Sequence, residues 1–101
     1  MTRIVVVAPL RPGTRDAVRE FVESGPPFDL GATQLGYHSV HLTAHEAVFV
    51  FEGPDARRDV EKLLGEPSVW RTAGAWRDWL AGRPRLANEV FGWSREKPDL
   101  S

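Results

Sequence analysis

The 101-residue sequence contains no cysteine. This absence excludes disulfides, thiol nucleophiles, iron–sulfur clusters and zinc-thiolate sites, and it fits a reducing compartment. The chain also lacks a long hydrophobic run. Its longest apolar stretch, residues 4–8, is far too short to span a membrane and has no signal-peptide pattern. We therefore expect a cytoplasmic protein without a membrane partner.

A strong excess of charge of either sign is also absent. The 13 basic and 14 acidic residues leave a formal net charge of −1, and the arginines are interleaved with acids. This balance does not favour binding to nucleic acid or to an anionic membrane. With 42% hydrophobic and 27% charged residues, the composition is that of one soluble domain. We place this domain at residues 1–93 and expect residues 94–101 to form a loosely ordered tail.

All three histidines and the single tyrosine lie in residues 36–53, which also carry the strongest strand signal. The pattern predicts strands at 36–42 and 47–52 with a turn at 43–46. A turn centred between Ala44 and His45 creates the facing pairs Leu42/Ala47, His41/Val48, Val40/Phe49, Ser39/Val50, His38/Phe51 and Tyr37/Glu52. Alternation then gives one face typical of a core. The other face is typical of a pocket wall and carries Val48, Val50, Tyr37, Ser39, His41 and Glu52.

The remaining residues predict two further strands and three helices. The strands are expected at 3–9 and 85–93, and the helices at 15–24, 54–64 and 66–82. Thr14 is the expected N-cap of the first helix, Gly25 its C-terminal stop, and Trp76 a core residue of the third. The order β-α-β-β-α-α-β is that of a ferredoxin-like α+β fold, with antiparallel sheet order 4-1-3-2 and helices on one face.

Such a sheet keeps one face uncovered. The strands at 3–9 and 47–52 are apolar on both faces, as central strands are. Their second face would form a large exposed apolar patch, which marks an interface or a ligand site. We therefore expect two copies to pack sheet against sheet as a homodimer. A contact with another protein through the loop at residues 28–35 is the less favoured alternative.

Three features resemble the dimeric α+β barrel superfamily, which includes the antibiotic-biosynthesis monooxygenase-like and stress-responsive barrel proteins. They are the element order, the Phe-Glu-Gly end of the third strand, and the Gly-Glu-Pro-Ser-Val-Trp step between the last two helices. The resemblance covers residues 3–93 and implies a homodimer that binds ligands inside the barrel or between sheet and helices. It implies diverse activities: cofactor-free oxygenation, polyketide cyclisation, haem degradation and isomerisation.

No cofactor is expected. Haem-degrading members of that superfamily use an Asn/Trp/His set, with the asparagine on the first strand and the other two residues on the helical segment. Here the strand at 3–9 has no asparagine and the helix at 66–82 has no histidine.

His41 is the candidate catalytic base, because histidine titrates near neutral pH and this one lies on the predicted pocket face. Tyr37 and Ser39, on the same face, are its candidate hydrogen-bonding partners. The alternative is a solvated or interface histidine on an edge strand. The candidate ligand contacts are Val48, Val50, Trp70 and Phe28. Glu52 is either a pocket carboxylate or, as we prefer, a cap for the helix after Gly53.

The histidine spacing predicts no metal site. His38, His41 and His45 would share a face only in a helix, whereas a strand puts His38 and His41 on opposite faces. The favoured function is a small homodimeric enzyme, monooxygenase- or cyclase-like, that acts without a cofactor on an apolar aromatic or polyketide-type molecule. A dimer that only binds such a ligand, or a purely structural dimer, is the alternative.

Overall fold

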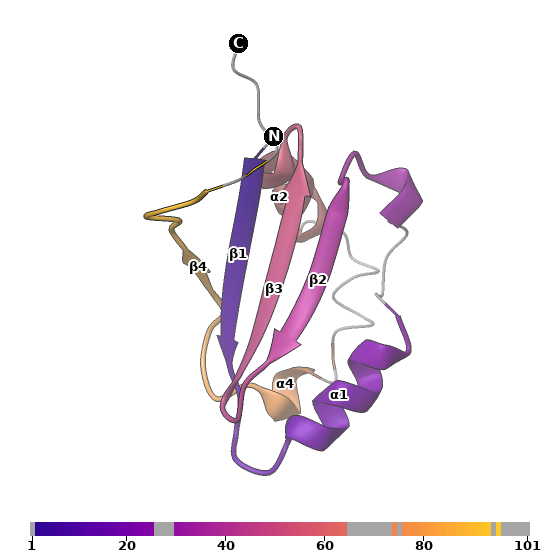
Figure 1. Ribbon diagram of the computed structural model, residues 1–101. Helices are drawn as coiled ribbons and strands as arrows, with labels where there is room; N and C mark the ends of the chain where they lie inside the picture. Colours follow the sequence, from indigo (N-terminus) through magenta and orange to yellow (C-terminus); the bar gives the residue numbers. More distant parts are fainter. Residues whose placement is uncertain (1, 26–29, 65–73, 75, 94, 96–101) are drawn as a thin grey trace.

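The computed structural model describes residues 2–25, 30–64, 74, 76–93 and 95. Its elements are β1 (Thr2–Pro9), α1 (Arg15–Glu23), the 3-10 helix η1 (Leu30–Ala32), β2 (Tyr37–Leu42), β3 (Glu46–Gly53), α2 (Ala56–Leu64), α4 (Trp76–Trp79) and β4 (Arg85–Ala87). The strands form one antiparallel sheet in the order β2-β3-β1-β4 (Figure 1). This order is the predicted 4-1-3-2 arrangement, and it confirms the ferredoxin-like α+β fold.

The hairpin of β2 and β3 has the register that alternation predicts. Each of the facing pairs, from Leu42↔Ala47 at the turn to Tyr37↔Glu52 at the open end, is present. The amide of Thr43 donates to the carbonyl of Glu46 at 2.9 Å and closes the turn. On its other side β3 pairs with β1 over the whole of both strands. The two apolar strands are therefore central, as their composition indicates.

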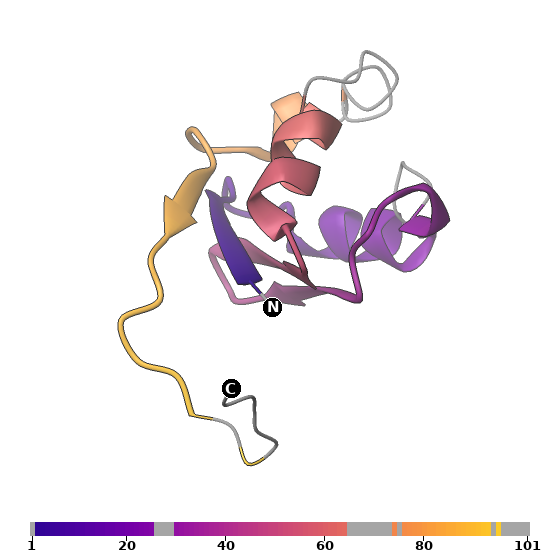
Figure 2. The ribbon, with the colours of Figure 1, turned by 90° about the horizontal axis from the view of Figure 1, so that it is seen from above.

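The core lies between one face of the sheet and the helices. Figure 2 shows α2 and α4 on the same side of the sheet. Val18 of α1 is fully buried there, in a cluster with Ala8 of β1 and Ala47 of β3. Around the cluster pack Val22, Leu42, Phe49, Trp76, Trp79 and Leu80. The stripe at Val18 and Val22 explains why α1 forms here, since only one side of this helix is apolar.

Aromatic side chains fill the space between α1, α4 and the sheet. Phe21 contacts Trp76 and Trp79, and Trp76 also contacts Phe49, all edge to face with ring centroids 5.4–6.0 Å apart. This geometry is favoured between aromatic rings and adds to the burial of their area. Trp76 is thus a core residue, as predicted.

The ends of α1 agree with the sequence in part. Gly25 has a φ of +105°, and its amide donates to the carbonyl of Val22 at 3.0 Å, which ends the helix as predicted. Thr14 is at the N-cap position, yet its side chain makes no capping hydrogen bond. Its hydroxyl donates instead to the carbonyl of Arg11 at 2.7 Å.

The last helix ends earlier than predicted. The described part, α4, stops at Trp79 rather than near Gly82, and the predicted start at residues 66–68 lies outside the described residues. Leu80 forms an isolated bridge with Leu10, and the amide of Ala81 donates to the carbonyl of Pro9 at 2.9 Å. These contacts with the end of β1 and with the residue after it take the place of the helical hydrogen bonds that would carry the helix beyond Leu80.

The fourth strand is shorter than the predicted 85–93. β4 ends at Ala87, which pairs with Val5, and the chain then leaves the sheet. Part of the reason is geometric: β1 begins at Thr2, so pairing in this register would run out of partners at Val90. The alternating pattern predicted a strand here, but it contains no information on where the neighbouring strand β1 begins, and so it did not predict where β4 ends. None of the helices in the described part of the chain has the length and hydropathy of a membrane-spanning segment.

Candidate ligand site on the open sheet face

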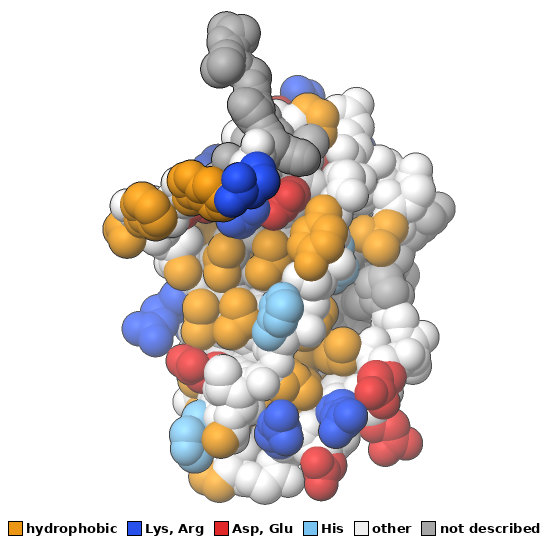
Figure 3. All heavy atoms as spheres, viewed as in Figure 1, with side chains coloured by type: hydrophobic (Ala, Val, Ile, Leu, Met, Phe, Trp, Pro, Cys, Tyr) orange, Lys and Arg blue, Asp and Glu red, His pale blue; other side chains and the backbone are white. Residues whose placement is uncertain are grey.

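The sheet face that points away from α2 carries side chains from all four strands. Because directly paired residues of antiparallel strands project to the same side, the register identifies them. This open face consists of Arg3, Val5 and Val7 of β1, Tyr37, Ser39 and His41 of β2, Val48, Val50 and Glu52 of β3, and Arg85 and Ala87 of β4. Figure 3 shows hydrophobic side chains gathered over the middle of the sheet on this face.

The valines form the centre of the open face. Val5 pairs with Val50, Val7 pairs with Val48, and all four side chains are half-buried. Their neighbours on the same strands, such as Ala8 and Ala47, are fully buried under the helices. The predicted ligand contacts Val48 and Val50 thus lie together in an apolar patch, which we call the valine cluster.

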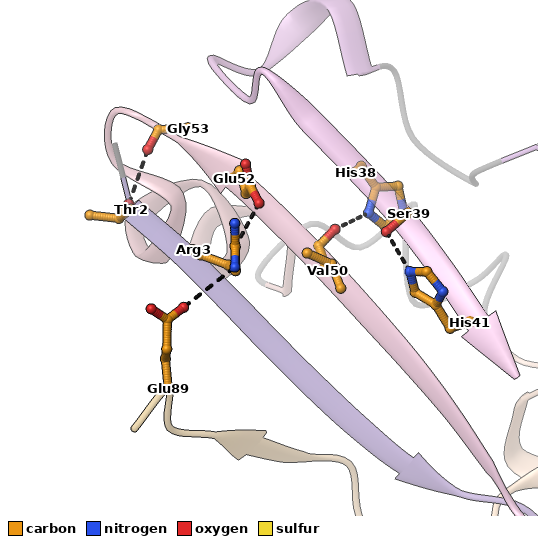
Figure 4. A network of polar contacts seen from close by, with 9 residues as sticks. All are labelled: Thr2, Arg3, His38, Ser39, His41, Val50, Glu52, Gly53 and Glu89. Atoms are coloured by element: carbon orange, nitrogen blue, oxygen red, sulfur yellow. Dashed lines mark hydrogen bonds and ion pairs between the residues drawn. The ribbon is translucent and has the colours of Figure 1, made fainter. Parts of the chain in front are cut away.

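Ser39 and His41 border the valine cluster on β2. The Oγ of Ser39 and the Nε2 of His41 are 2.9 Å apart and share a hydrogen bond (Figure 4). His41 is exposed and Ser39 is half-buried. Two residues apart on a strand, they point to the same face, which is why β2 brings them together. Ser39 and His41 are therefore the two members of the predicted catalytic set that contact each other directly.

Tyr37 is on the same face but apart from that pair. His41 lies four positions further along β2, a distance of about 14 Å along a strand. The side chain is 50% exposed. Its hydroxyl makes no hydrogen bond to any residue that the structure describes. At this separation Tyr37 and His41 cannot reach the same small polar group, so the predicted set of three divides into a pair and a separate residue.

One end of the open face carries an ion-pair network that the sequence analysis did not contain. Arg3 Nε lies 2.6 Å from Glu52 Oε2, and Arg3 Nη1 lies 3.6 Å from Glu89 Oε1 (Figure 4). The preferred role of Glu52 as a helix cap is therefore wrong, since its carboxylate binds Arg3 across the strands. The sequence signal that could have predicted this ion pair is the opposite charge of Arg3 and Glu52, which face each other across β1 and β3.

His38 lies on the opposite face from His41, as alternation predicts. Its Nδ1 donates to the carbonyl of Val50 at 2.9 Å, and its ring stacks on Phe51 with centroids 4.4 Å apart. Among the described residues, no three histidine, aspartate or glutamate side chains form a group that could hold a metal ion. The ligand contacts predicted at Phe28 and Trp70 lie outside the described residues.

A solved structure with a similar fold comes from Chloroflexus aurantiacus J-10-fl and bears the provisional name of antibiotic biosynthesis monooxygenase. The similarity has a TM-score of 0.51 at 16% sequence identity and covers 92% of this chain and 98% of that one. No protein-family model and no curated protein matches the sequence. The chain has the ferredoxin-like α+β fold of that protein. This confirms, at the level of the fold, the resemblance drawn from element order and local motifs.

Proposed function

We propose that two copies of this chain pair through their open faces and enclose a small apolar molecule of aromatic or polyketide type. The valine cluster supports the pairing, because it is a contiguous apolar patch on a sheet face that no described helix covers. When two copies are related by a two-fold axis, the patch on one copy can pack against the same patch on the other. The formal net charge of −1 adds little repulsion between the copies.

His41 is the base in this proposal. Ser39 holds its Nε2 at 2.9 Å, and within the described residues Nδ1 has no hydrogen-bond partner. With Nε2 donating to Ser39, Nδ1 accepts the proton of a phenol or enol. The ligand O–H bond then breaks and an N–H bond forms, which leaves an electron-rich phenolate or enolate. Such an anion attacks molecular oxygen or an electrophilic carbon, as monooxygenase- and cyclase-type reactions require.

Tyr37 has a separate role at the far end of the face. Its exposed hydroxyl donates to a second polar group of the ligand, about 14 Å along β2 from His41. A ligand that reaches both residues spans several fused rings. This length is why we favour aromatic and polyketide-type molecules over small acids or sugars. The similar fold of the Chloroflexus aurantiacus protein supports a monooxygenase-like reaction by analogy alone.

The observation that carries the proposal is the Ser39–His41 pair beside the valine cluster, and its chemistry is testable with para-nitrophenol. The phenolate of this small aromatic probe absorbs visible light, and the neutral phenol does not. We expect the bound probe to contain more phenolate than the free probe at the same pH. His41→Gln, which keeps polarity but cannot take up the proton, should remove this excess. His45→Gln, a change at the exposed turn histidine, is the matched control and should retain it.

Two measurements decide between outcomes. Sedimentation of the wild-type protein as a monomer at all concentrations would reject the paired arrangement. A dimer that binds the probe with an unchanged phenolate fraction in His41→Gln would reject the role of His41 as base and identify a ligand-binding dimer.

A further inference from the structure

Residues 88–93, which we call the C-terminal arm, expose large apolar side chains. After Ala87 the chain leaves the sheet, and Val90, Phe91 and Trp93 are 94%, 82% and 70% exposed. The Arg95 guanidinium lies 5.0 Å above the Trp93 ring, but this contact does not bury it. Exposed aromatic side chains so close together are unusual on the surface of a monomeric protein, and they indicate a surface that another molecule covers.

The direction of the arm indicates what covers it. Figure 2 shows the arm running from β4 to the side of the sheet opposite α2, beyond the open face. The core elements of the same chain, including Val18 of α1, lie on the helix side. The arm therefore projects into the space that a second copy occupies when it covers the open face.

The root of the arm is attached to the open face itself. Glu89 lies 3.6 Å from Arg3, which in turn binds Glu52 at 2.6 Å (Figure 4). These contacts hold the start of the arm beside the end of the valine cluster. The arm and the open face are thus parts of one continuous surface.

We propose that the arm of each copy packs against the second copy, so that Phe91 and Trp93 form part of the wall of the cavity between the two sheets. This inference rests on the proposed homodimer. An aromatic side chain buries roughly 150–250 Å², so the two rings on each of two arms supply roughly 600–1,000 Å². Specific interfaces bury roughly 1,200–2,000 Å², and the valine clusters contribute to the remainder. The ligand site is then composite, with His41 from one copy and aromatic rings from the other.

The first test compares the dimer dissociation constants of two variants by sedimentation equilibrium. The double variant Phe91→Ala/Trp93→Ala should weaken the dimer by at least about tenfold, as loss of aromatic anchors does. Arg58→Ala, which shortens an exposed side chain on α2, is the control and should not weaken it. Far-ultraviolet circular dichroism should be unchanged in both, since neither change touches the core. An unchanged dissociation constant in the double variant would overturn the inference and leave the paired open faces intact.

The second test uses the absence of native cysteine. A chain with Phe91→Cys is mixed with a longer, tagged chain carrying Val48→Cys, and a flexible bismaleimide is added. We expect a cross-linked product containing both chains. A chain with both substitutions, diluted into excess cysteine-free protein, should give little internal cross-link. The reverse pattern, internal cross-links only, would show that the arm folds back on its own chain. A monomeric wild-type protein would reject the homodimer and this inference together.

Discussion

The two faces of the sheet are built from the same strands and differ in what covers them. On the helix face, Ala8, Ala47 and Phe51 are buried under helices and aromatic rings. Other apolar residues of the helix face are half-buried, whereas on the open face none of the described strand residues is buried, and Val5 and Val50 are at most half-buried. Composition is therefore insufficient to identify the core of this protein. The position of the helices decides which apolar face is the core and which one the described helices do not cover.

Histidines illustrate the same contrast. His38, on the helix face, donates to the carbonyl of Val50 and stacks on Phe51, so its polar atom and its ring are both engaged by the fold. His41, on the open face, is exposed and contacts Ser39. Three residues apart, the first has a structural role and the second is available to a ligand.

The largest expected effect comes from comparing substitutions at Phe49 and Val50, two neighbouring residues that lie on opposite faces of the sheet. Phe49→Ala removes a ring that packs on Trp76 in the core and should lower the free energy of unfolding by about 3 kcal/mol. Val50→Ala, its neighbour on the open face, should cost about 1 kcal/mol or less in the single chain. Urea denaturation at several protein concentrations measures both. The Val50→Ala effect should grow with concentration as dimer forms, whereas equal losses at every concentration would contradict the assignment of the faces.

A charge on the open face should act on association rather than on folding. Val50→Asp places a carboxylate in each valine cluster, and pairing the faces then buries two like charges. We expect the dimer dissociation constant to rise by at least about 100-fold, about 2.7 kcal/mol. Sedimentation measures this change, and circular dichroism checks the fold. Glu61→Gln, on the exposed side of α2, is the control. A Val50→Asp protein that dimerises normally would place the interface elsewhere.

A smaller effect is expected at Gly53, where the chain before β2 crosses the helix face. A Cβ at Gly53 would lie 3.0 Å from the carbonyl oxygen of Gln34 and 3.1 Å from the Cα of Leu35, both backbone atoms. Gly53→Ala should therefore cost about 1–2 kcal/mol of stability. Gly36→Ala, whose Cβ would meet no atom within 4 Å, is the matched control and should cost less than about 0.5 kcal/mol. Equal melting temperatures for the two variants would show that the segment before β2 shifts at little energetic cost to accommodate the added Cβ.

Local rules predicted the hairpin well and its surroundings less well. The register of β2 with β3 follows from one turn and strict alternation, so residue types alone suffice to place Ser39 beside His41. The partner of Glu52 depends on the register between β1 and β3, which are far apart in the sequence. For the same reason the sequence did not indicate the Arg3–Glu52–Glu89 network or the end of β4 at Ala87.

The sequence by itself determined the order of the elements, the central and edge strands, and which hairpin side chains share a face. These properties depend on alternation, turn residues and apolar stripes, which act over a few neighbouring residues. Only the tertiary structure decided that Glu52 binds Arg3, that α4 stops where Leu80 meets Leu10, and that residues 88–93 leave the sheet toward the open face. Those outcomes depend on contacts between distant segments, and such contacts exist only once the sheet has formed.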